Sequence, residues 1–129
     1  MHAVDANVLV RLFTGDDAEQ TRRVAALFKK ENIFVPKTVL LETEWVLRRL
    51  YKLDSKIVVS ALRKLSGLAN VEIEQSQTVA QALLWCEDGM DFADALHLAS
   101  SENCRKFATF DLKLKKLAAK GLKPSVLLL

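Results

Sequence analysis

The chain has 129 residues, of which half are apolar and 27% are charged, and its formal net charge is +3. This size and balance are typical of one compact domain, predicted here over residues 1–129, and they exclude a disordered chain. The apolar runs are too short to span a membrane, and no secretory signal is visible, so we expect a cytoplasmic protein. Cys86 and Cys104 have neither zinc-site nor redox-pair spacing and are expected to be free thiols.

Apolar spacing and turn residues predict strands that alternate with helices. A capping box of Asp16 and Glu19 is expected at the start of the second helix. The predicted elements are, in chain order, a strand at 2–5, helices at 7–14 and 17–30, a strand at 33–36, helices at 38–50 and from 54 or 55, a strand at 71–74, helices at 77–87 and from about 91, a strand at 106–110, a helix at 112–120 and a strand at 125–129. This alternation indicates an α/β fold with a central, mainly parallel sheet of four to five strands, covered by helices on both faces.

Several aspartates stand where a strand ends or a helix begins. Ligands of parallel sheets bind beyond the carboxyl ends of the strands, which directs attention to Asp5 and Asp111. Each of these residues can instead be the N-cap of the helix that follows, which stabilises a helix by about 1 kcal/mol. Asp91 and Asp94 fit a capping pair in the same way. Taken one at a time, the capping role is the more common explanation.

Two other acids are candidates for a buried site. Asp94 lies on a helix with apolar residues on both faces, including Leu98 beside it, so its carboxylate needs a cation or hydrogen-bond donors. Glu44 has Arg48 four residues later, which is sufficient for a surface ion pair. Glu42 has no such partner at that spacing. We therefore expect Glu42, rather than Glu44, to be the buried site acid.

Four acids, Asp5, Glu42, Asp94 and Asp111, would carry four negative charges if they converged. Carboxylates that close cannot all remain ionised without compensation. One or two hard divalent cations provide it most simply, and oxygen-only ligands favour Mg²⁺ or Mn²⁺ over zinc.

Four segments resemble one known family. "VDANVLVRL", "VPKTVLLETEWVLRRL", "DFADALHLA" and "FATFD" occur in the order seen in PIN-domain ribonucleases, and the chain is most similar to the VapC-type toxins of prokaryotic toxin–antitoxin pairs. The resemblance extends from about residue 2 to residue 128. It implies a PIN-like three-layer α/β/α sandwich.

The resemblance also implies roles for individual residues. The positions that match the family's four catalytic and metal-binding acids are Asp5, Glu42, Asp94 and Asp111, and the secondary site candidates are Asn7, Asp91 and Thr109. Ala6 stands where many relatives carry Ser or Thr, which removes one hydroxyl from the site. His97 is expected to pack against its neighbours or to make a structural hydrogen bond.

The activity implied is hydrolysis of RNA phosphodiester bonds with one or two Mg²⁺ or Mn²⁺ ions. Asp5 and Asp94 would hold the main ion, while Glu42 and Asp111 would complete its shell, bind a second ion or orient the water. A homodimer and a cognate antitoxin that covers the acidic site are also implied. Val39, Trp45, Leu50 and Tyr51 are candidates for partner contacts, or equally for the core.

Positive charge gathers in the last part of the chain. From residue 105 onward there are seven Lys or Arg residues and one acid, Asp111. Such a segment suits the phosphates of RNA.

Other functions fit some of these features. A non-toxin PIN nuclease in RNA processing and a catalytically silent PIN module that binds RNA or protein share the same motifs. A phosphoacceptor α/β domain also uses strand-end aspartates, but a haloacid-dehalogenase-like enzyme needs a second Asp at position 7, which is Asn7. A response-regulator receiver needs an acidic pair where Asp5 stands alone.

Overall fold

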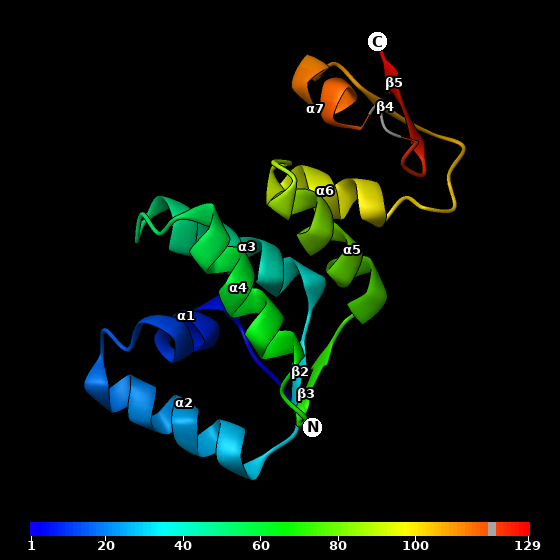
Figure 1. The fold of residues 1–129 in the computed structure, drawn as a ribbon. Helices are drawn as coiled ribbons and strands as arrows, with labels where there is room; N and C mark the ends of the chain where they lie inside the picture. The colour runs from blue at the N-terminus through cyan, green and yellow to red at the C-terminus, as the bar shows by residue number, and fades with distance from the viewer. Residues whose placement is uncertain (119–120) are drawn as a thin grey trace. The chain divides into compact units, whose positions relative to one another are not determined.

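A computed structural model of the chain describes residues 1–118 and 121–129. The chain forms two compact units, Met1–Ser76 (unit 1) and Gln77–Leu129 (unit 2), each of which is described by itself (Figure 1). Among the described residues, no helix is long and apolar enough to cross a membrane. The single domain over residues 1–129 stays a prediction.

Unit 1 is built on three short parallel strands. These are β1 (His2–Ala3), β2 (Ile33–Val35) and β3 (Val71–Ile73), in the order β1-β2-β3. The register pairs Ala3 with Phe34 and Val35 with Ile73. Ile33 and Val35 are fully buried, as expected for the central strand of a parallel sheet.

Four helices complete unit 1: α1 (Ala6–Thr14), α2 (Ala18–Lys30), α3 (Lys37–Arg49) and α4 (Ser55–Ser66). Helix α1 packs against both α2 and α3, and α3 packs against α4. The core of this unit is aliphatic and includes Leu9, Leu40, Leu47 and Leu62, each of which is at most 1% exposed. The apolar spacing seen in the sequence thus becomes the buried face of each helix.

Unit 2 contains α5 from its second residue onward (Ser76–Glu87), α6 (Phe92–Ala99), β4 (Lys106–Thr109), α7 (Leu112–Leu117) and β5 (Ser125–Leu128). Strands β4 and β5 are parallel and lie side by side in Figure 1, with α7 between them in sequence. Their register pairs Lys106 with Ser125 and Thr109 with Leu128. Phe92 and Leu98 are buried.

Aspartates begin most of these helices. The N-cap residues whose carboxylates accept a hydrogen bond from a backbone N–H of the first turn are Asp5, Asp17, Asp54, Asp91 and Asp111. The predicted capping box of Asp16 and Glu19 is wrong by one residue, because Asp17 accepts from the Gln20 N–H at 3.0 Å. Glu19 instead pairs with arginines of its own helix, which leaves Asp16 for another role.

The predicted α/β fold with parallel strands is confirmed, and every strand begins at its predicted residue. The five strands form two sheets, of three and two strands, where a single sheet was expected. Strands this short have few backbone groups to share, and in the described residues β4 and β5 pair only with each other. The predicted end of the last helix, at residue 120, lies outside the described residues.

Candidate functional site

The surroundings of Asp94 within its own unit change the chemistry of its carboxyl group. It lies in the first turn of α6, a helix that buries Phe92, Ala95 and Leu98 and therefore has apolar residues on both faces, as predicted. The side chain of Asp94 is half-buried. Burial, first, and the nearby carboxylates of Asp91 and Asp111 raise the pKa of Asp94 above its usual value.

Two neighbouring groups partly offset this effect. His97 and Lys113 both act to lower the pKa of Asp94. Lys113 lies in the first turn of α7, two residues after Asp111, a position that the sequence analysis counted only as part of a basic segment. His97 is exposed and so is not part of the core, and the expectation that it packs against its neighbours or makes a structural hydrogen bond stays a prediction.

The other two acids of this cluster are helix caps. Asp91 accepts a hydrogen bond from the Asp94 N–H at 3.3 Å, and Asp111 accepts one from the Leu114 N–H at 3.0 Å. The hydroxyl oxygen of Thr109 accepts from the Asp111 N–H at 3.0 Å and so helps to fix the turn between β4 and α7. The capping role predicted for both aspartates is confirmed. Unit 2 therefore gathers three carboxylates at the starts of α6 and α7.

Unit 1 carries the other two candidate acids. Asp5 follows β1 and caps α1, where its Oδ1 accepts from the Val8 N–H at 3.2 Å. Asn7 is exposed in the first turn of the same helix, and Glu42 is exposed on α3. The expectation that Glu42 is a buried acid is therefore wrong.

The buried acid of α3 is Glu44, which is 3% exposed. Its carboxylate binds Arg48 through two hydrogen bonds, from Nε at 2.7 Å and from Nη2 at 3.3 Å. The predicted i,i+4 ion pair is confirmed, but it is not on the surface. Spacing along one helix identifies the partner and carries no information on which other elements cover that face.

The donor types fit a hard divalent cation, because the candidate ligands of both units are carboxylates. In the part of the chain that the structure describes, no group of three or more His, Cys, Asp or Glu side chains is arranged to hold a metal ion. Across the same residues, every buried side-chain nitrogen or oxygen has a hydrogen-bond partner. The structure does show that the negative charge of the Asp94 carboxylate is not fully compensated, because its pKa is raised.

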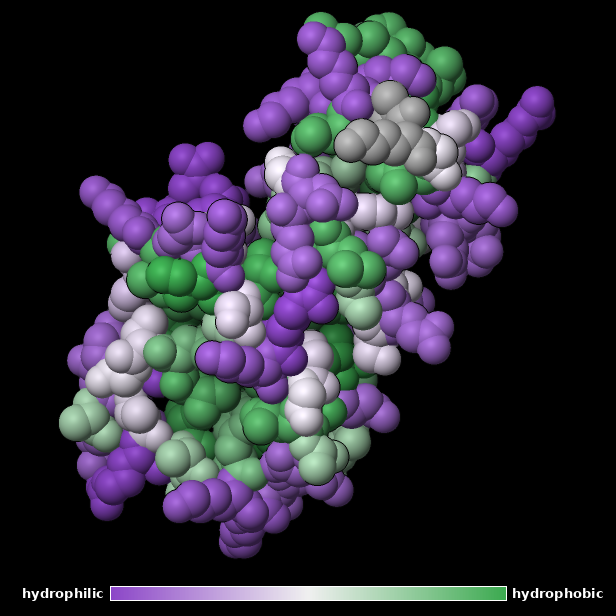
Figure 2. All heavy atoms as spheres, viewed as in Figure 1, coloured by the Kyte–Doolittle hydropathy of each residue, from purple (hydrophilic) through white to green (hydrophobic). Residues whose placement is uncertain are grey.

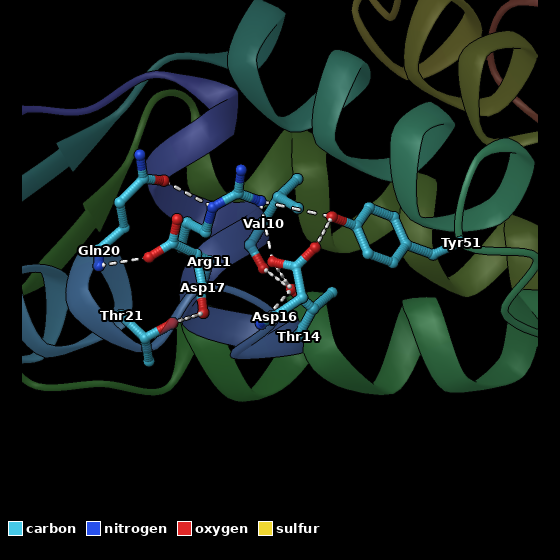
Figure 3. Close-up of polar contacts among 8 residues, drawn as sticks. All are labelled: Val10, Arg11, Thr14, Asp16, Asp17, Gln20, Thr21 and Tyr51. Carbon is cyan, nitrogen blue, oxygen red and sulfur yellow. Dashed lines mark hydrogen bonds and ion pairs between the residues drawn. The ribbon is translucent and has the colours of Figure 1, made fainter.

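A polar cluster in unit 1 was not foreseen from the sequence (Figure 3). Arg11 donates to Gln20 at 2.7 Å, to Asp16 at 3.0 Å and to the Tyr51 hydroxyl at 3.3 Å. Tyr51 in turn donates to Asp16 at 2.5 Å, and Thr14 donates to it at 3.1 Å. These bonds hold the α1–α2 turn to the segment after α3, and they lower the pKa of Asp16, the hydrogen bond from Tyr51 most strongly.

Two of the residues considered for partner contacts are on the surface. Trp45 is 50% exposed and Leu50 is 65% exposed, so the alternative that they belong to the core is wrong. Tyr51 is accounted for by its bonds to Asp16 and Arg11.

Comparison with known proteins identifies a family profile and several similar solved structures. The profile described as "PIN domain" matches residues 3–120. The crystal structure of Mycobacterium tuberculosis VapC20, described as a Sarcin-Ricin loop cleaving toxin, is 20% identical, with 96% of this chain and 98% of that chain covered and a TM-score of 0.45. No curated protein matches the chain. Because the family profile covers nearly the whole sequence, the chain belongs to the PIN domain family.

Proposed function

We propose that this PIN domain is a Mg²⁺- or Mn²⁺-dependent ribonuclease and the toxin of a VapBC-type toxin–antitoxin pair. The observation that carries the proposal is the cluster of Asp91, Asp94 and Asp111 at the starts of α6 and α7. Structural needs explain the two caps but not a half-buried carboxylate on α6 that two other carboxylates repel.

The proposed metal ligands follow from the position of each acid in the family's motifs. Asp5 and Asp94 would hold the main ion, and Glu42 and Asp111 would complete its shell, hold a second ion or orient the water. When bound, such an ion lowers the pKa of its water ligand and polarises a phosphoryl oxygen. A divalent charge would also offset the burial and the carboxylate repulsion that raise the pKa of Asp94.

The residues around these acids have supporting roles. Capping holds Asp5 and Asp111 through one oxygen each, Oδ1, and so fixes the direction of the other carboxylate oxygen. Thr109 holds the backbone of Asp111, and Asn7 offers an exposed amide close to Asp5 in the chain. Asp91, which caps α6, adds negative charge beside Asp94.

RNA is the proposed substrate and a cognate antitoxin the proposed partner, with the protein a homodimer in the cytoplasm. The described part of the C-terminal segment exposes six basic side chains, those of Arg105, Lys106, Lys113, Lys115, Lys116 and Lys123. These charges would bind RNA phosphates with an affinity that depends on salt and little on sequence.

The test separates capping from catalysis at Asp5. Asparagine caps a helix as well as aspartate does, so Asp5→Asn should retain stability and lose Mn²⁺-dependent cleavage of RNA. Asp5→Ala should lose cleavage and also about 1 kcal/mol of stability. The measurements are cleavage of a fluorescent RNA with Mn²⁺ and with EDTA, and urea unfolding of each variant.

Asp17 provides a matched control, because it caps α2 with the same three-residue spacing and lies outside the family's motifs. Asp17→Asn should cleave RNA as the wild type does. Cleavage by Asp5→Asn at the wild-type rate, or full activity in EDTA, would refute the metal mechanism. A wild-type protein that binds RNA and never cleaves it would point to a silent PIN module instead.

A further inference from the structure

Phe110 is the most exposed large apolar residue of the described chain, with 82% of its surface open to solvent. It lies between Thr109, the last residue of β4, and Asp111, the N-cap of α7. Thr109 forms the last pair of the sheet, with Leu128, and its carbonyl accepts a hydrogen bond from the Leu129 N–H at 2.8 Å. Phe110 is therefore the first residue beyond the sheet. The described residues of unit 2 leave most of the ring uncovered, so their packing does not require an aromatic residue at position 110.

The surroundings of Phe110 combine apolar and positive side chains. Leu112 is 53% exposed and Leu129 is 64% exposed, and Figure 2 shows hydrophobic atoms gathered over α7 and the end of β5, with hydrophilic ones beside them. The six exposed basic residues named above come from the same elements and from the segments that flank them. Asp111 is the one acid described in this part of the chain.

An exposed ring on a basic surface suits single-stranded nucleic acid better than it suits an apolar partner. Proteins bind single strands by stacking bases on aromatic rings while positive side chains follow the phosphates. Double-stranded RNA keeps its bases stacked on one another and offers no free face to such a ring. Phe110 directly precedes Asp111 in the chain, so a base stacked on its ring would lie beside a proposed metal ligand.

We propose that Phe110 stacks on an unpaired base of the RNA substrate, beside the bond that is cut. This inference rests on the proposed ribonuclease function and adds the residue that reads the substrate. Lys113, in the first turn of α7 and two residues after Asp111, is on the same short segment and is placed to bind the adjoining phosphate.

The experiment measures binding and cleavage with three variants. Phe110→Leu keeps an apolar side chain without an aromatic ring, Phe110→Ala removes both, and Phe110→Trp restores a ring. Binding to a fluorescent single-stranded RNA oligonucleotide in EDTA, and to its duplex, is followed by anisotropy. Leu112→Ala is the matched control, because it removes an exposed apolar side chain on the other side of Asp111.

The leucine and alanine variants should bind the single strand roughly 5- to 150-fold more weakly, the range expected for the loss of one base–aromatic stack. Phe110→Trp and Leu112→Ala should bind within about twofold of the wild type, because each leaves a ring in place. Duplex binding and melting temperature should not change in any variant. In cleavage assays with Mn²⁺, the loss should fall on KM.

The outcomes distinguish this inference from the function on which it rests. If the wild type cleaves RNA and Phe110→Leu binds the single strand equally well, stacking is refuted and the nuclease stands. If Phe110→Ala instead changes the oligomeric state in size-exclusion chromatography, while Phe110→Leu does not, the patch is a protein interface and the inference is wrong. A wild type that neither binds nor cleaves RNA would overturn both.

Discussion

The ion pair between Glu44 and Arg48 is buried on one side only, and this asymmetry determines what breaking it should cost. Glu44 is 3% exposed, whereas the side chain of Arg48 is 25% exposed. Arg48→Met keeps the aliphatic stem of Arg48 and leaves the Glu44 carboxylate without its guanidinium in a nearly dry environment. Removal of one partner of a buried pair typically costs 3–5 kcal/mol.

The lower end of that range applies, because water can reach the place that the guanidinium leaves. We expect Arg48→Met to lose about 3 kcal/mol, which is roughly a 150-fold change in the folding equilibrium. For a chain of this size the corresponding fall in melting temperature is about 10 °C. Circular dichroism with heat and with urea measures both quantities.

Two controls make the interpretation specific. Arg23 pairs with Glu19 at the same i,i+4 spacing, but 75% and 53% of the two side chains are exposed, so Arg23→Met should cost at most about 0.5 kcal/mol. The double variant Glu44→Leu/Arg48→Met removes both charges and should regain most of the loss. If Arg48→Met and Arg23→Met destabilise the protein equally, the carboxylate of Glu44 is not held in a low-dielectric site and the reasoning fails.

Two further predictions concern pH. The pKa of Asp16 is lowered, so its ionised form adds stability above the ordinary aspartate value of about 3.9 and loses it as the pH falls through the lowered pKa. Tyr51→Phe removes the largest cause, so this variant should lose less stability than the wild type on acidification in urea titrations. The pKa of Asp94 is raised, so its ionised form opposes folding at neutral pH. Asp94→Asn should therefore melt higher than the wild type at pH ~7, with the gain disappearing below about 3.9. A lower melting temperature at neutral pH would contradict the destabilisation of the ionised carboxylate by burial and by Asp91 and Asp111.

The order and starts of the elements were predictable because local residues determine them. Gly15 ends α1 with a positive φ of 64°, and aspartates begin five helices. These capping residues can be read from the sequence and marked the helix boundaries. The pairing of the strands was less predictable. Which short strands share a sheet depends on contacts between segments far apart in sequence, and here β4 and β5 pair with each other.

The candidate site was also predictable only in part. The motifs identified Asp94, and apolar residues on both faces of α6 correctly indicated that it is not a plain surface acid. The choice between Glu42 and Glu44 failed because it used the i+4 partner alone as a guide to burial. The bonds of Tyr51 to Asp16 and Arg11 join positions at least 35 residues apart, so no local pattern could have revealed them.

Capping and catalysis looked like rival explanations for the aspartates, but the structure makes them compatible. In Asp5 and Asp111 the cap uses Oδ1, so the same residue can hold the start of a helix and present its second oxygen to a cation. Asp17 and Asp54 cap α2 and α4 in similar ways and lie outside the motifs. A role as a helix N-cap is therefore no evidence for or against a role in the metal site. What distinguishes Asp111 is its neighbour, since its charge helps to raise the pKa of Asp94, and a helix start needs no such repulsion.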